Sequence, residues 1–494
     1  MSIATLNPDR VWKHFHALTQ IPRPSKHEQK VVEFVTKFGK DLGLETIVDG
    51  VGNVIIRKPA AKGMENRRGI ILQAHLDMVP QKREGKEHDF TTDPIETYVD
   101  GEWVKAKDTT LGADNGLGVA AAMAILEDKT LSHGLIEALF TVDEETGMTG
   151  AFGLEAGALQ GKILLNLDSE EWGDICIGCA GGVDVEATLS YKEKKAPKGY
   201  TAFNLKVKDC LGGHSGVDIN KGRANPTKLL FRFLNHCLYN FDMKLSEAHG
   251  GNMRNAIPTN AYATILIAND DVKNFETEVE KFAETAKKEF RETEPKMKIE
   301  AVKTETPRFI IEECTAEKII KAIFICPHGV ERMSFAMENL VETSNNIGIV
   351  NIPYADKEGK RISNGVMKVC CLTRSSVDTA KEGVMFRIGT IFDLIGAHVE
   401  FSGAYPGWAP NPDSPILQVM KETYQKMYGT APNVSAIHAG LECALFSKVY
   451  PDWDMISFGP TIQYPHSPDE RLEISTVQKF YNLLVEVLKN APVK

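Results

Sequence analysis

Apolar and polar positions alternate in blocks along the first 180 residues, and these blocks predict strands separated by helices. Ile70–His75 and Leu135–Val142 are short apolar runs of the kind found in buried strands, and Lys162–Asp168 repeats the pattern. Between them, the Ala-rich segment Leu117–Leu126 has the length and composition of a buried helix. Strands that alternate with helices predict a mostly parallel sheet with helices on both faces.

The pattern changes between residues 182 and 397. A Glu- and Lys-rich stretch over residues 272–300 has the spacing of solvated helices. Two octapeptides 160 residues apart resemble each other, Leu211–Asp218 and Cys371–Asp378, and each follows an apolar strand and precedes a helical pattern. A repeat of this length predicts two related α+β halves that arose by duplication. Chance similarity over eight residues is the alternative.

The alternating pattern returns at residue 398. Strand and helix patterns follow one another there: His398–Phe401, Pro415–Tyr428, Asp454–Phe458 and Val477–Lys489. We therefore predict an α/β protein in which residues 1–181 and 398–494 form one discontinuous domain. Residues 182–397 are predicted to form a second, inserted α+β domain.

Composition and charge exclude several classes of protein. With 43% hydrophobic and 25% charged residues, the chain is neither collagen-like nor disordered. Its net charge of −10 disfavours binding to the phosphate backbone of nucleic acids. The longest apolar run, Val119–Leu126, falls far short of the ~20 residues of a membrane helix. The N-terminus shows no signal-peptide pattern, so we expect a cytoplasmic protein without membrane contact.

The cysteines agree with a reducing compartment. Nine cysteines are an odd number, spread thinly over 494 residues, which favours reduced thiols over a disulfide framework. Cys176 and Cys179 have the spacing of a redox or metal pair. No second pair and no nearby histidine completes such a site, so we expect two thiols in the core.

Residues that carry chemistry cluster where the predicted strands end. His75 and Asp77 are two residues apart on an extended chain, so both side chains point to one face. An aspartate at this position can orient a histidine that binds metal, although a structural histidine is the alternative. Asp114 opens the Ala-rich helix between Gly112 and Gly116. It is either a helix N-cap or part of a backbone that approaches a ligand closely.

Two further acidic clusters follow strands. Asp143, Glu144 and Glu145 come directly after the strand that ends at Val142, and Asp168 ends the next strand. Adjacent carboxylates are costly unless a cation or solvent neutralises them. A solvated loop is the alternative. Where a metal is present, one of two neighbouring acids can bind it while the other transfers protons.

Considered together, the clusters predict a hydrolytic metal site. Ligands of open α/β sheets bind outside the carboxyl ends of the strands, and four side chains are offered to that edge: His75, Asp114, Glu145 and Asp168. Histidine with carboxylates and no cysteine suits Zn, Mn or Co. A shared carboxylate suits two metal ions about 3.5–4 Å apart. HExxH, GxSxG, GxGxxG and Walker motifs are all absent.

At this point the motifs resemble a known family. They are His75–Asp77, Gly112–Gly116, Asp143–Gly147, Asp168–Glu170, His466–Glu470 and the early Ile21–Ser25. Together they resemble the co-catalytic dizinc peptidases, a family of carnosinases, glutamate carboxypeptidases, peptidase T, aminoacylases and succinyl-diaminopimelate desuccinylases. The resemblance runs nearly end to end. It implies a catalytic domain built from residues 1–181 and 398–494, with residues 182–397 as a lid domain.

The resemblance also implies a role for each matching residue. The metal ligands would be His75, Asp114, Glu145, Asp168 and His466, with Asp114 bridging the two metals. Glu144 would be the general base, and Asp77 its supporting carboxylate. In the lid, His214 would polarise the scissile carbonyl. The substrate carboxylate would be held by Asn255, Arg374 and the backbone near Gly440.

The implied activity is hydrolysis of dipeptides, including those that end in histidine, with two divalent ions as cofactors. Zn is the favoured metal, with Co or Mn as alternatives. The expected partners are small dipeptides. A homodimer stays open, because a duplicated lid can stand in for a partner subunit. The same metal core would also suit an N-acyl amino acid deacylase or a tripeptide aminopeptidase. A non-catalytic binding protein is disfavoured, because every ligand and the base are present.

Overall fold

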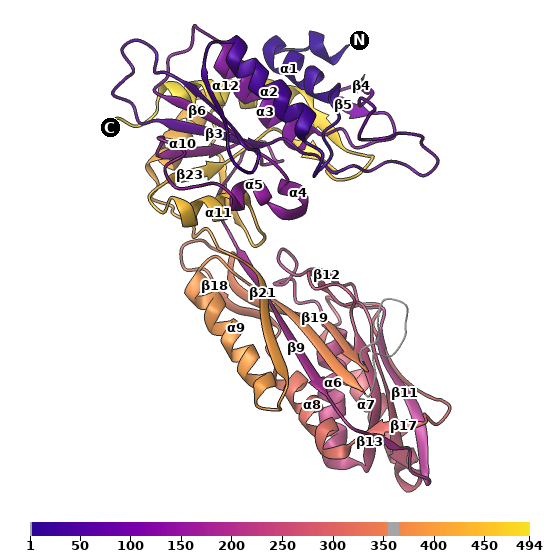
Figure 1. The fold of residues 1–494 in the computed structure, drawn as a ribbon. Helices are drawn as coiled ribbons and strands as arrows, with labels where there is room; N and C mark the ends of the chain where they lie inside the picture. The colour runs from indigo at the N-terminus through magenta and orange to yellow at the C-terminus, as the bar shows by residue number, and fades with distance from the viewer. Residues whose placement is uncertain (1, 354–364) are drawn as a thin grey trace. The chain divides into compact units, whose positions relative to one another are not determined.

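The computed structural model describes residues 2–353 and 365–494, which fold into two compact units (Figure 1). The first unit comprises Met1–Cys179, Trp408–Ala436 and Leu441–Lys494. The second unit comprises Ala180–Gly407 and the short segment Ile437–Gly440. In the described residues, no helix combines the length and the apolar character needed to cross a bilayer.

The first unit contains strands and helices in alternation. Its elements before the second unit are η1 (Ile3–Thr5), α1 (Asp9–Thr19), α2 (Gln29–Asp41), β1 (Glu45–Val48), β2 (Val54–Lys58), β3 (Ile70–His75), β4 (Thr97–Asp100), β5 (Trp103–Ala106), α3 (Ala113–Glu127), β6 (Ile136–Thr141), α4 (Glu144–Gly147), α5 (Thr149–Phe152), β7 (Ile163–Asn166) and β8 (Asp174–Cys179). Those after it are α10 (Pro415–Tyr428), β22 (Asn433–Ile437), α11 (Glu442–Val449), β23 (Asp454–Ser457), β24 (Ile462–Gln463), β25 (Arg471–Glu473) and α12 (Ile474–Lys489).

An eight-stranded sheet forms the centre of the first unit, in the order β1-β2-β6-β3-β7-β23-β8-β22. The four central strands β6, β3, β7 and β23 are parallel. Antiparallel strands flank them, with β2 beside β6 and β8 beside β23. Helices cover both faces (Figure 1). The predicted parallel sheet is therefore the middle part of a mixed sheet. Strand β3 ends at His75, and β6 ends just before the acidic residues 143–145, which are candidate site residues.

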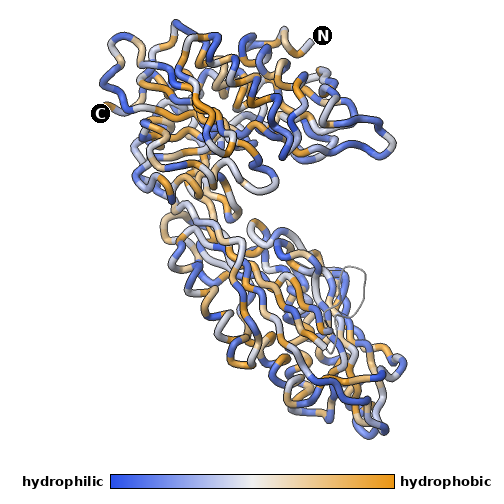
Figure 2. Tube along the Cα trace, in the orientation of Figure 1, coloured by the Kyte–Doolittle hydropathy of each residue, from blue (hydrophilic) through white to orange (hydrophobic). Residues whose placement is uncertain are grey.

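Local sequence explains why these elements form. Every residue of β3, β6 and β7 is buried, as expected for central strands of a sheet covered on both faces. Strands β3 and β6, labelled in Figure 1, show as hydrophobic stretches in Figure 2. Helix α10 begins with Pro415 after the N-cap Ser414, whose Oγ accepts a hydrogen bond from Leu417 N at 3.1 Å. It ends at Gly429, which adopts φ 74°.

The second unit is an α+β fold. Its elements are β9 (Gly181–Ser190), β10 (Glu193–Lys195), β11 (Tyr200–Lys208), β12 (Gly213–His214), α6 (Pro226–Asn240), β13 (Met243–Gly250), β14 (Ala256–Ile257), β15 (Ala261–Ala268), η2 (Asn269–Asp271), α7 (Val272–Glu289), β16 (Lys298–Lys303), β17 (Phe309–Ile311), α8 (Glu313–Ile325), β18 (Gly329–Met333), β19 (Val341–Ile352), β20 (Val366–Ser375), α9 (Asp378–Asp393) and β21 (His398–Tyr405).

The nine-stranded sheet of this unit has two halves with the same arrangement. The halves are β16-β11-β15-β13 and β19-β20-β9-β21, joined between β13 and β19, and the ninth strand, β18, also pairs with β19. The first half follows the chain order β11, α6, β13, β15, α7, β16. The corresponding elements of the second half are β20, α9, β21, β9, α8 and β19, of which β9, α8 and β19 come earlier in the chain. This shared arrangement is what two related halves would show, and it matches the repeat that contains His214 and Arg374.

The structure differs from the predicted domain boundaries at two places. Strand β21 pairs with the edge of β9, so residues 398–407 belong to the second unit and not to the first. The segment Ile437–Gly440 also belongs to the second unit. Within that unit, the helix predicted over residues 272–300 ends at Glu289, ahead of Pro295, and residues 298–303 form β16. Proline disfavours helical backbone at the residue before it and in the preceding turn.

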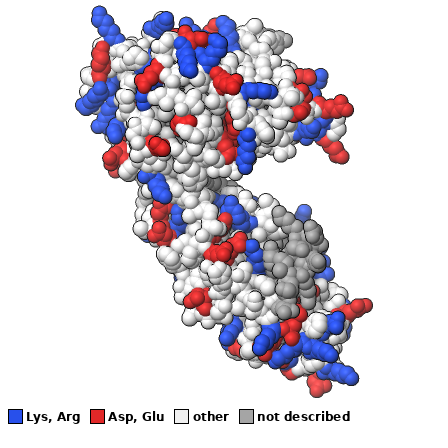
Figure 3. All heavy atoms as spheres, in the orientation of Figure 1, with Lys and Arg blue, Asp and Glu red and all other residues white. Residues whose placement is uncertain are grey.

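Surface charge and cysteines agree with the composition. On the face drawn in Figure 3, acidic and basic side chains are interspersed. None of the nine cysteines forms a disulfide, and eight of them are buried. Cys176 and Cys179 both lie in β8. Burial raises the pKa of the Cys179 thiol well above its ordinary value, which keeps the thiol protonated. The pair is thus two core thiols, as predicted.

Candidate active site

The first predicted cluster lies at the end of β3. His75 is 1% exposed, and its Nδ1 lies 3.3 Å from Asp77 Oδ1 and 3.2 Å from the Asp77 carbonyl oxygen. Its Nε2 lies 3.0 Å from Asp114 Oδ1 and 3.4 Å from Asp168 Oδ1. Asp77 therefore holds one ring nitrogen, and the other faces two carboxylates from different elements. This is the arrangement of a histidine prepared to bind metal.

Asp77 also fixes the acidic loop that follows β6. Its Oδ1 accepts a hydrogen bond from Glu144 N at 3.0 Å, and its Oδ2 accepts bonds from Glu145 N at 3.2 Å and Ser25 Oγ at 2.8 Å. Burial disfavours the charged form of Asp77. His75 and these donors outweigh burial and lower its pKa to about 2. A buried, charged Asp77 thus connects three separate segments of the first unit.

Asp114 lies between the two imidazoles. Its Oδ1 faces His75, and its Oδ2 lies 3.0 Å from His466 Nε2. The same His466 nitrogen lies 3.0 Å from Glu145 Oε2. Ligand atoms of His75, Asp114 and Glu145 all lie within 4.8 Å of one another. His466 is in the loop between β24 and β25 and has a left-handed φ of 58°. A carboxylate with one oxygen toward each histidine has the geometry of a bridging ligand.

The electrostatics of this cluster call for positive charge. Hydrogen bonds that His466 donates to the carboxylates of Asp114 and Glu145 raise its pKa to about 11. Burial opposes a charge on His75, yet the nearby carboxylates of Asp168 and Asp114 raise its pKa well above the ordinary value. Burial raises the pKa of Asp168 to about 6. Glu145 Oε1 is buried without a hydrogen-bond partner in the described part of the chain. A divalent cation would meet each of these needs.

Two residues to which the sequence analysis gave no role support the cluster. Glu470 is buried, and its carboxylate accepts hydrogen bonds from four successive backbone N–H groups, those of Leu111, Gly112, Ala113 and Asp114, at 2.7, 3.0, 2.8 and 3.3 Å. Buried Arg23 donates to the carbonyl oxygens of Leu76 and Asp77, each at 2.9 Å. Both residues lie in motifs that carried the family resemblance. Only the folded structure shows that they hold the backbone of the ligands.

Another carboxyl group lies buried in the same unit, on α11. Glu442 Oε2 accepts hydrogen bonds from Gln73 Nε2 at 2.6 Å and from Thr141 Oγ1 at 2.9 Å. Burial raises its pKa to about 8. Gln73 and Thr141 belong to β3 and β6, the strands that lead to His75 and to the acidic loop. Glu442 therefore ties α11 to the sheet beneath the cluster.

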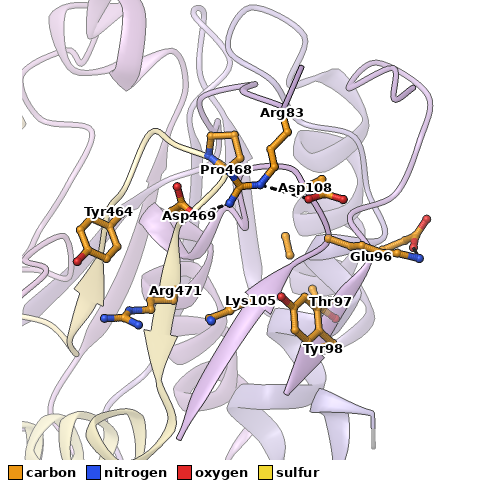
Figure 4. Close-up of a pocket in the computed structure, with 12 residues that line it drawn as sticks. Arg83, Glu96, Thr97, Tyr98, Lys105, Asp108, Tyr464, Pro468, Asp469 and Arg471 are labelled. Atoms are coloured by element: carbon orange, nitrogen blue, oxygen red, sulfur yellow. Dashed lines mark hydrogen bonds and ion pairs between the residues drawn. The ribbon is translucent and has the colours of Figure 1, made fainter. Parts of the chain in front are cut away.

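A cavity of about 690 Å³ adjoins the His466 loop (Figure 4). Tyr464, Pro468 and Asp469 line it together with residues of the β4–β5 hairpin. Arg83 lies 3.3 Å from Asp108 and also pairs with Asp469, as the dashed lines show. Arg83 thereby fastens the loop that carries His466 to the rest of the first unit.

The predicted lid residues lie in the second unit. His214 Nδ1 accepts hydrogen bonds from the backbone N–H groups of Gly216 and Val217, both at 3.2 Å. This places the imidazole proton on Nε2, which is left to donate. Burial lowers the pKa of His214, and Arg374 lowers it further, which keeps the ring neutral.

Arg374 is the centre of a second cluster. Its Nε donates to Ser215 Oγ at 3.3 Å, and its Nη1 donates to Tyr405 Oη at 2.9 Å. Ser215 N in turn donates to the Asn255 carbonyl oxygen at 2.9 Å. Gly440 lies against the Tyr405 ring. The four predicted residues His214, Asn255, Arg374 and Gly440 are therefore neighbours within this unit, and Ser215 and Tyr405 link them.

The eleven predicted residues thus form two groups. The structure brings seven of them together in the first unit: His75, Asp77, Asp114, Glu144, Glu145, Asp168 and His466. The other four gather around Arg374 in the second unit. Sequence reasoning missed the links in both groups. Tyrosine and glutamate are common residues, so the sequence alone does not show which of them will be buried and link a cluster.

Comparisons with known proteins cover the whole chain. A model of peptidase family M20/M25/M40 matches residues 71–490. The cytosol non-specific dipeptidase of Escherichia coli (strain K12) is 43% identical over 492 residues, which are 100% of this chain and 99% of that protein. The crystal structure of aminoacylhistidine dipeptidase from Vibrio alginolyticus is 44% identical, with a TM-score of 0.95 over 100% of this chain and 99% of that one. Aminopeptidase PepT from Bacillus cereus shares the fold at a TM-score of 0.60 and 18% identity, over 98% and 99% of the two chains.

Proposed function

Because the chain belongs to peptidase family M20/M25/M40, we propose that it is a cytoplasmic dipeptidase with two divalent metal ions at its active site. Its substrates are dipeptides of broad sequence, including those that end in histidine. The observation that carries this proposal is the pairing of Asp114 with both His75 and His466 inside a buried acidic cluster. Similarity over the full length to two proteins named as dipeptidases supports the substrate class.

The residues of the first unit fit a pair of metal ions. His75, Asp114 and Asp168 would hold one ion, and Asp114, Glu145 and His466 would hold the other. Three carboxylates offset most of the charge of two divalent cations, and two neutral imidazoles complete the donor set. Nitrogen and oxygen ligands without cysteine favour Zn, with Co or Mn as alternatives. Metal analysis of the purified protein identifies the ion.

Glu144 would be the base of the reaction. Two divalent ions, when bound, polarise the scissile carbonyl and lower the pKa of the attacking water. Glu144 then takes the proton of that water and delivers it to the leaving amine. The hydrogen bond from its backbone N–H to Asp77 fixes the start of α4, which carries both Glu144 and Glu145. Asp77 thus aligns the base with the ligands.

The second unit would recognise the substrate. His214 Nε2–H would donate to the carbonyl oxygen, which gains negative charge as the water attacks. Arg374 would bind the C-terminal carboxylate, with help from the Asn255 side chain and the backbone near Gly440. A carboxylate held at a fixed distance from the scissile bond measures substrate length. Such a site admits one residue beyond that bond, as a dipeptide requires.

A substrate panel tests the proposal. The purified protein is assayed against dipeptides, tripeptides and N-acyl amino acids, each before and after treatment with a chelator. We expect chelator-sensitive cleavage of dipeptides, with little turnover of the other two classes. Preference for tripeptides would indicate an aminopeptidase, and preference for N-acyl substrates would indicate a deacylase. No turnover at all would indicate a binding protein.

We also propose that the protein is a homodimer. Strand β21 is an edge of the nine-stranded sheet, and all its residues are exposed or half-exposed. Phe401 on this strand is 43% exposed, and Phe386 on α9, which packs against it, is 56% exposed. An unpaired edge with exposed aromatic rings favours pairing with another chain. Light scattering of the purified protein measures the oligomeric state.

A further inference from the structure

Arg374 is a buried cation without a counter-ion. The residue is 5% exposed, and in residues 2–353 and 365–494 no carboxylate lies within ion-pair distance of its guanidinium. Asp184, a carboxylate that influences the same region, is already paired with Arg254 at 3.1 Å. Because a buried charge without a partner is costly, this guanidinium is placed for an anion that comes from outside the chain.

The hydrogen bonds of Arg374 show which part of it is available. Nε is used by Ser215 Oγ, and one proton of Nη1 is used by Tyr405 Oη. The guanidinium has five N–H groups, so one proton on Nη1 and two on Nη2 have no partner in the described structure. All three are on the two Nη atoms, at the outer edge of the planar group. That edge can bind both oxygens of a carboxylate.

Tyr405 stands beside this edge. Its hydroxyl oxygen accepts the proton of Arg374 Nη1, so the hydroxyl proton is left to donate, and no acceptor for it is found in the described chain. The tyrosine itself is firmly held. Its carbonyl oxygen accepts a hydrogen bond from Lys381 Nζ at 2.5 Å, and Lys381 is also paired with Asp378 at 2.7 Å.

Two glycines make room for the Tyr405 ring. A Cβ atom added at Gly182 would lie 2.7 Å from the ring, and one added at Gly440 would lie 3.1 Å from it. The first distance is a clash, and the second is tighter than an ordinary contact. The absence of a side chain at these two glycines therefore lets the Tyr405 ring pack against the backbone. In this position its hydroxyl lies next to Arg374. Gly440 was predicted to act through its backbone, and its lack of a side chain also makes room for the Tyr405 ring.

From this geometry we propose that Tyr405 is a specificity-determining residue. Its hydroxyl donates a hydrogen bond to the substrate's C-terminal carboxylate and accepts one from Arg374, which orients the guanidinium. This inference rests on the proposed function, in which Arg374 binds that carboxylate. The ligand class is a peptide with a free C-terminus. A C-terminal amide offers a single acceptor oxygen, and its NH₂ group would face the N–H and O–H donors of Arg374 and Tyr405. Tyr405 thus adds to discrimination against amides.

The test compares a dipeptide with its C-terminal amide in four variants. Tyr405→Phe removes only the hydroxyl. We expect kcat/KM for the free acid to fall about 10-fold, through a higher KM. The loss of one hydrogen bond to a charged group weakens binding by about this factor. The amide should change less than about twofold. Tyr200→Phe is the matched control, since it removes a hydroxyl bonded to Asp242 elsewhere in the same unit, and should change neither substrate.

Two further variants separate the possible explanations. Ser215→Ala loosens Arg374 at Nε without removing a donor to the carboxylate, so its loss for the acid should be smaller than that of Tyr405→Phe. Equal losses in the two variants would show that Tyr405 only orients the guanidinium. Equal losses for acid and amide in Tyr405→Phe would overturn the inference entirely. Arg374→Gln tests the underlying function, because a loss that is equal for acid and amide there would remove Arg374 from carboxylate binding. If Arg374→Gln is selective and Tyr405→Phe is not, only the inference on Tyr405 fails.

Discussion

The two units contain clusters of opposite charge. In each cluster, the buried charges are not balanced by opposite charges among the described residues. In the first unit, Asp114, Glu145 and Asp168 gather with two histidines, and burial makes their charges costly without a cation. In the second unit, Arg374 is buried without a carboxylate partner in the part of the chain that the structure describes. The first cluster calls for metal ions, and the second calls for an anion. The proposed dipeptide substrate offers both kinds of group, a carbonyl oxygen that suits metal ions and a carboxylate that suits a guanidinium.

The clusters also differ in how the chain builds them. The proposed ligands of the first cluster lie within short motifs, most of them at strand ends, so local sequence contains most of its chemistry. The second cluster combines β12, β20, β21 and the segment Ile437–Gly440. No motif marks these positions as neighbours. A metal site thus leaves a stronger mark on sequence than a site for a carboxylate does.

The largest expected effect is removal of the metal ions, which breaks the first cluster and leaves the second intact. Dialysis against a chelator should abolish activity, because the proposed reaction depends on the ions for its attacking water. Addition of Zn, Mn or Co should restore activity, and metal analysis should follow it in parallel. Full activity in a sample verified as metal-free would contradict the proposed centre.

The next effect separates the two neighbouring acids of α4. Glu144→Gln should retain both ions and lower kcat by about 10²–10⁴, the usual contribution of general acid–base catalysis. Glu145→Gln is the matched control, and it should lower metal content because it removes a ligand beside His466. Metal content and kcat are measured on the same preparations. The opposite pattern would exchange the two roles.

Within the second cluster, His214→Ala should have the larger effect. Loss of one donor to the developing oxyanion costs about 10²–10³ in kcat. Both a dipeptide and its amide contain the scissile carbonyl, so kcat should fall equally for the two substrates. Steady-state kinetics on the matched pair measures this. A loss confined to the free acid would move His214 from the carbonyl to the carboxylate.

Arg374→Lys should have a smaller and selective effect. Lysine retains the charge but cannot bind a carboxylate with two parallel hydrogen bonds. KM for the free acid should therefore rise about 10–100-fold, and KM for the amide should change far less. The ratio of the two KM values is the readout. An unchanged ratio would show that the second cluster does not read the C-terminus.

These predictions depend on residues that sequence patterns identified to different degrees. Apolar periodicity located β3, β6, β7 and α10 within a residue or two, because burial on both faces of a sheet requires continuous apolar runs. The edge strand β21 was assigned to the wrong side of a boundary. Its residues are mostly exposed, so its pattern says nothing about the sheet it joins.

The same limit applies to the candidate site. Strand ends marked His75 and Asp168, and the start of the Ala-rich helix marked Asp114, because their place in the sequence fixes their place at the sheet edge. Glu470 and Tyr405 act through backbone N–H groups and a guanidinium that are remote in the chain. Such contacts depend on how distant segments pack. Their residue types are common, so no local pattern distinguishes them from ordinary buried side chains.

The smallest expected effect sharpens the separation of the clusters. Arg83 pairs with Asp469, three residues beyond His466, and with Asp108 at 3.3 Å (Figure 4). Its side chain is 50% exposed, and exposed ion pairs contribute only about 0.2–1 kcal/mol. Arg83→Gln should therefore weaken the metal affinity of the His466 site by at most about fivefold. A titration with a competing chelator measures the change.

The kinetic readouts of Arg83→Gln test whether the two clusters are independent. Because the ion pairs of Arg83 in the described residues lie within the first unit, the ratio of KM values for acid and amide should match that of the unmodified protein. Lys107→Gln provides the control, since Lys107 lines the same cavity and faces Glu96 at 3.5 Å, and among the described residues it has no ion pair with the His466 loop. It should leave metal affinity unchanged. An altered acid-to-amide ratio in Arg83→Gln would show that the His466 loop influences carboxylate binding, and the two clusters would then have to be treated as one coupled site.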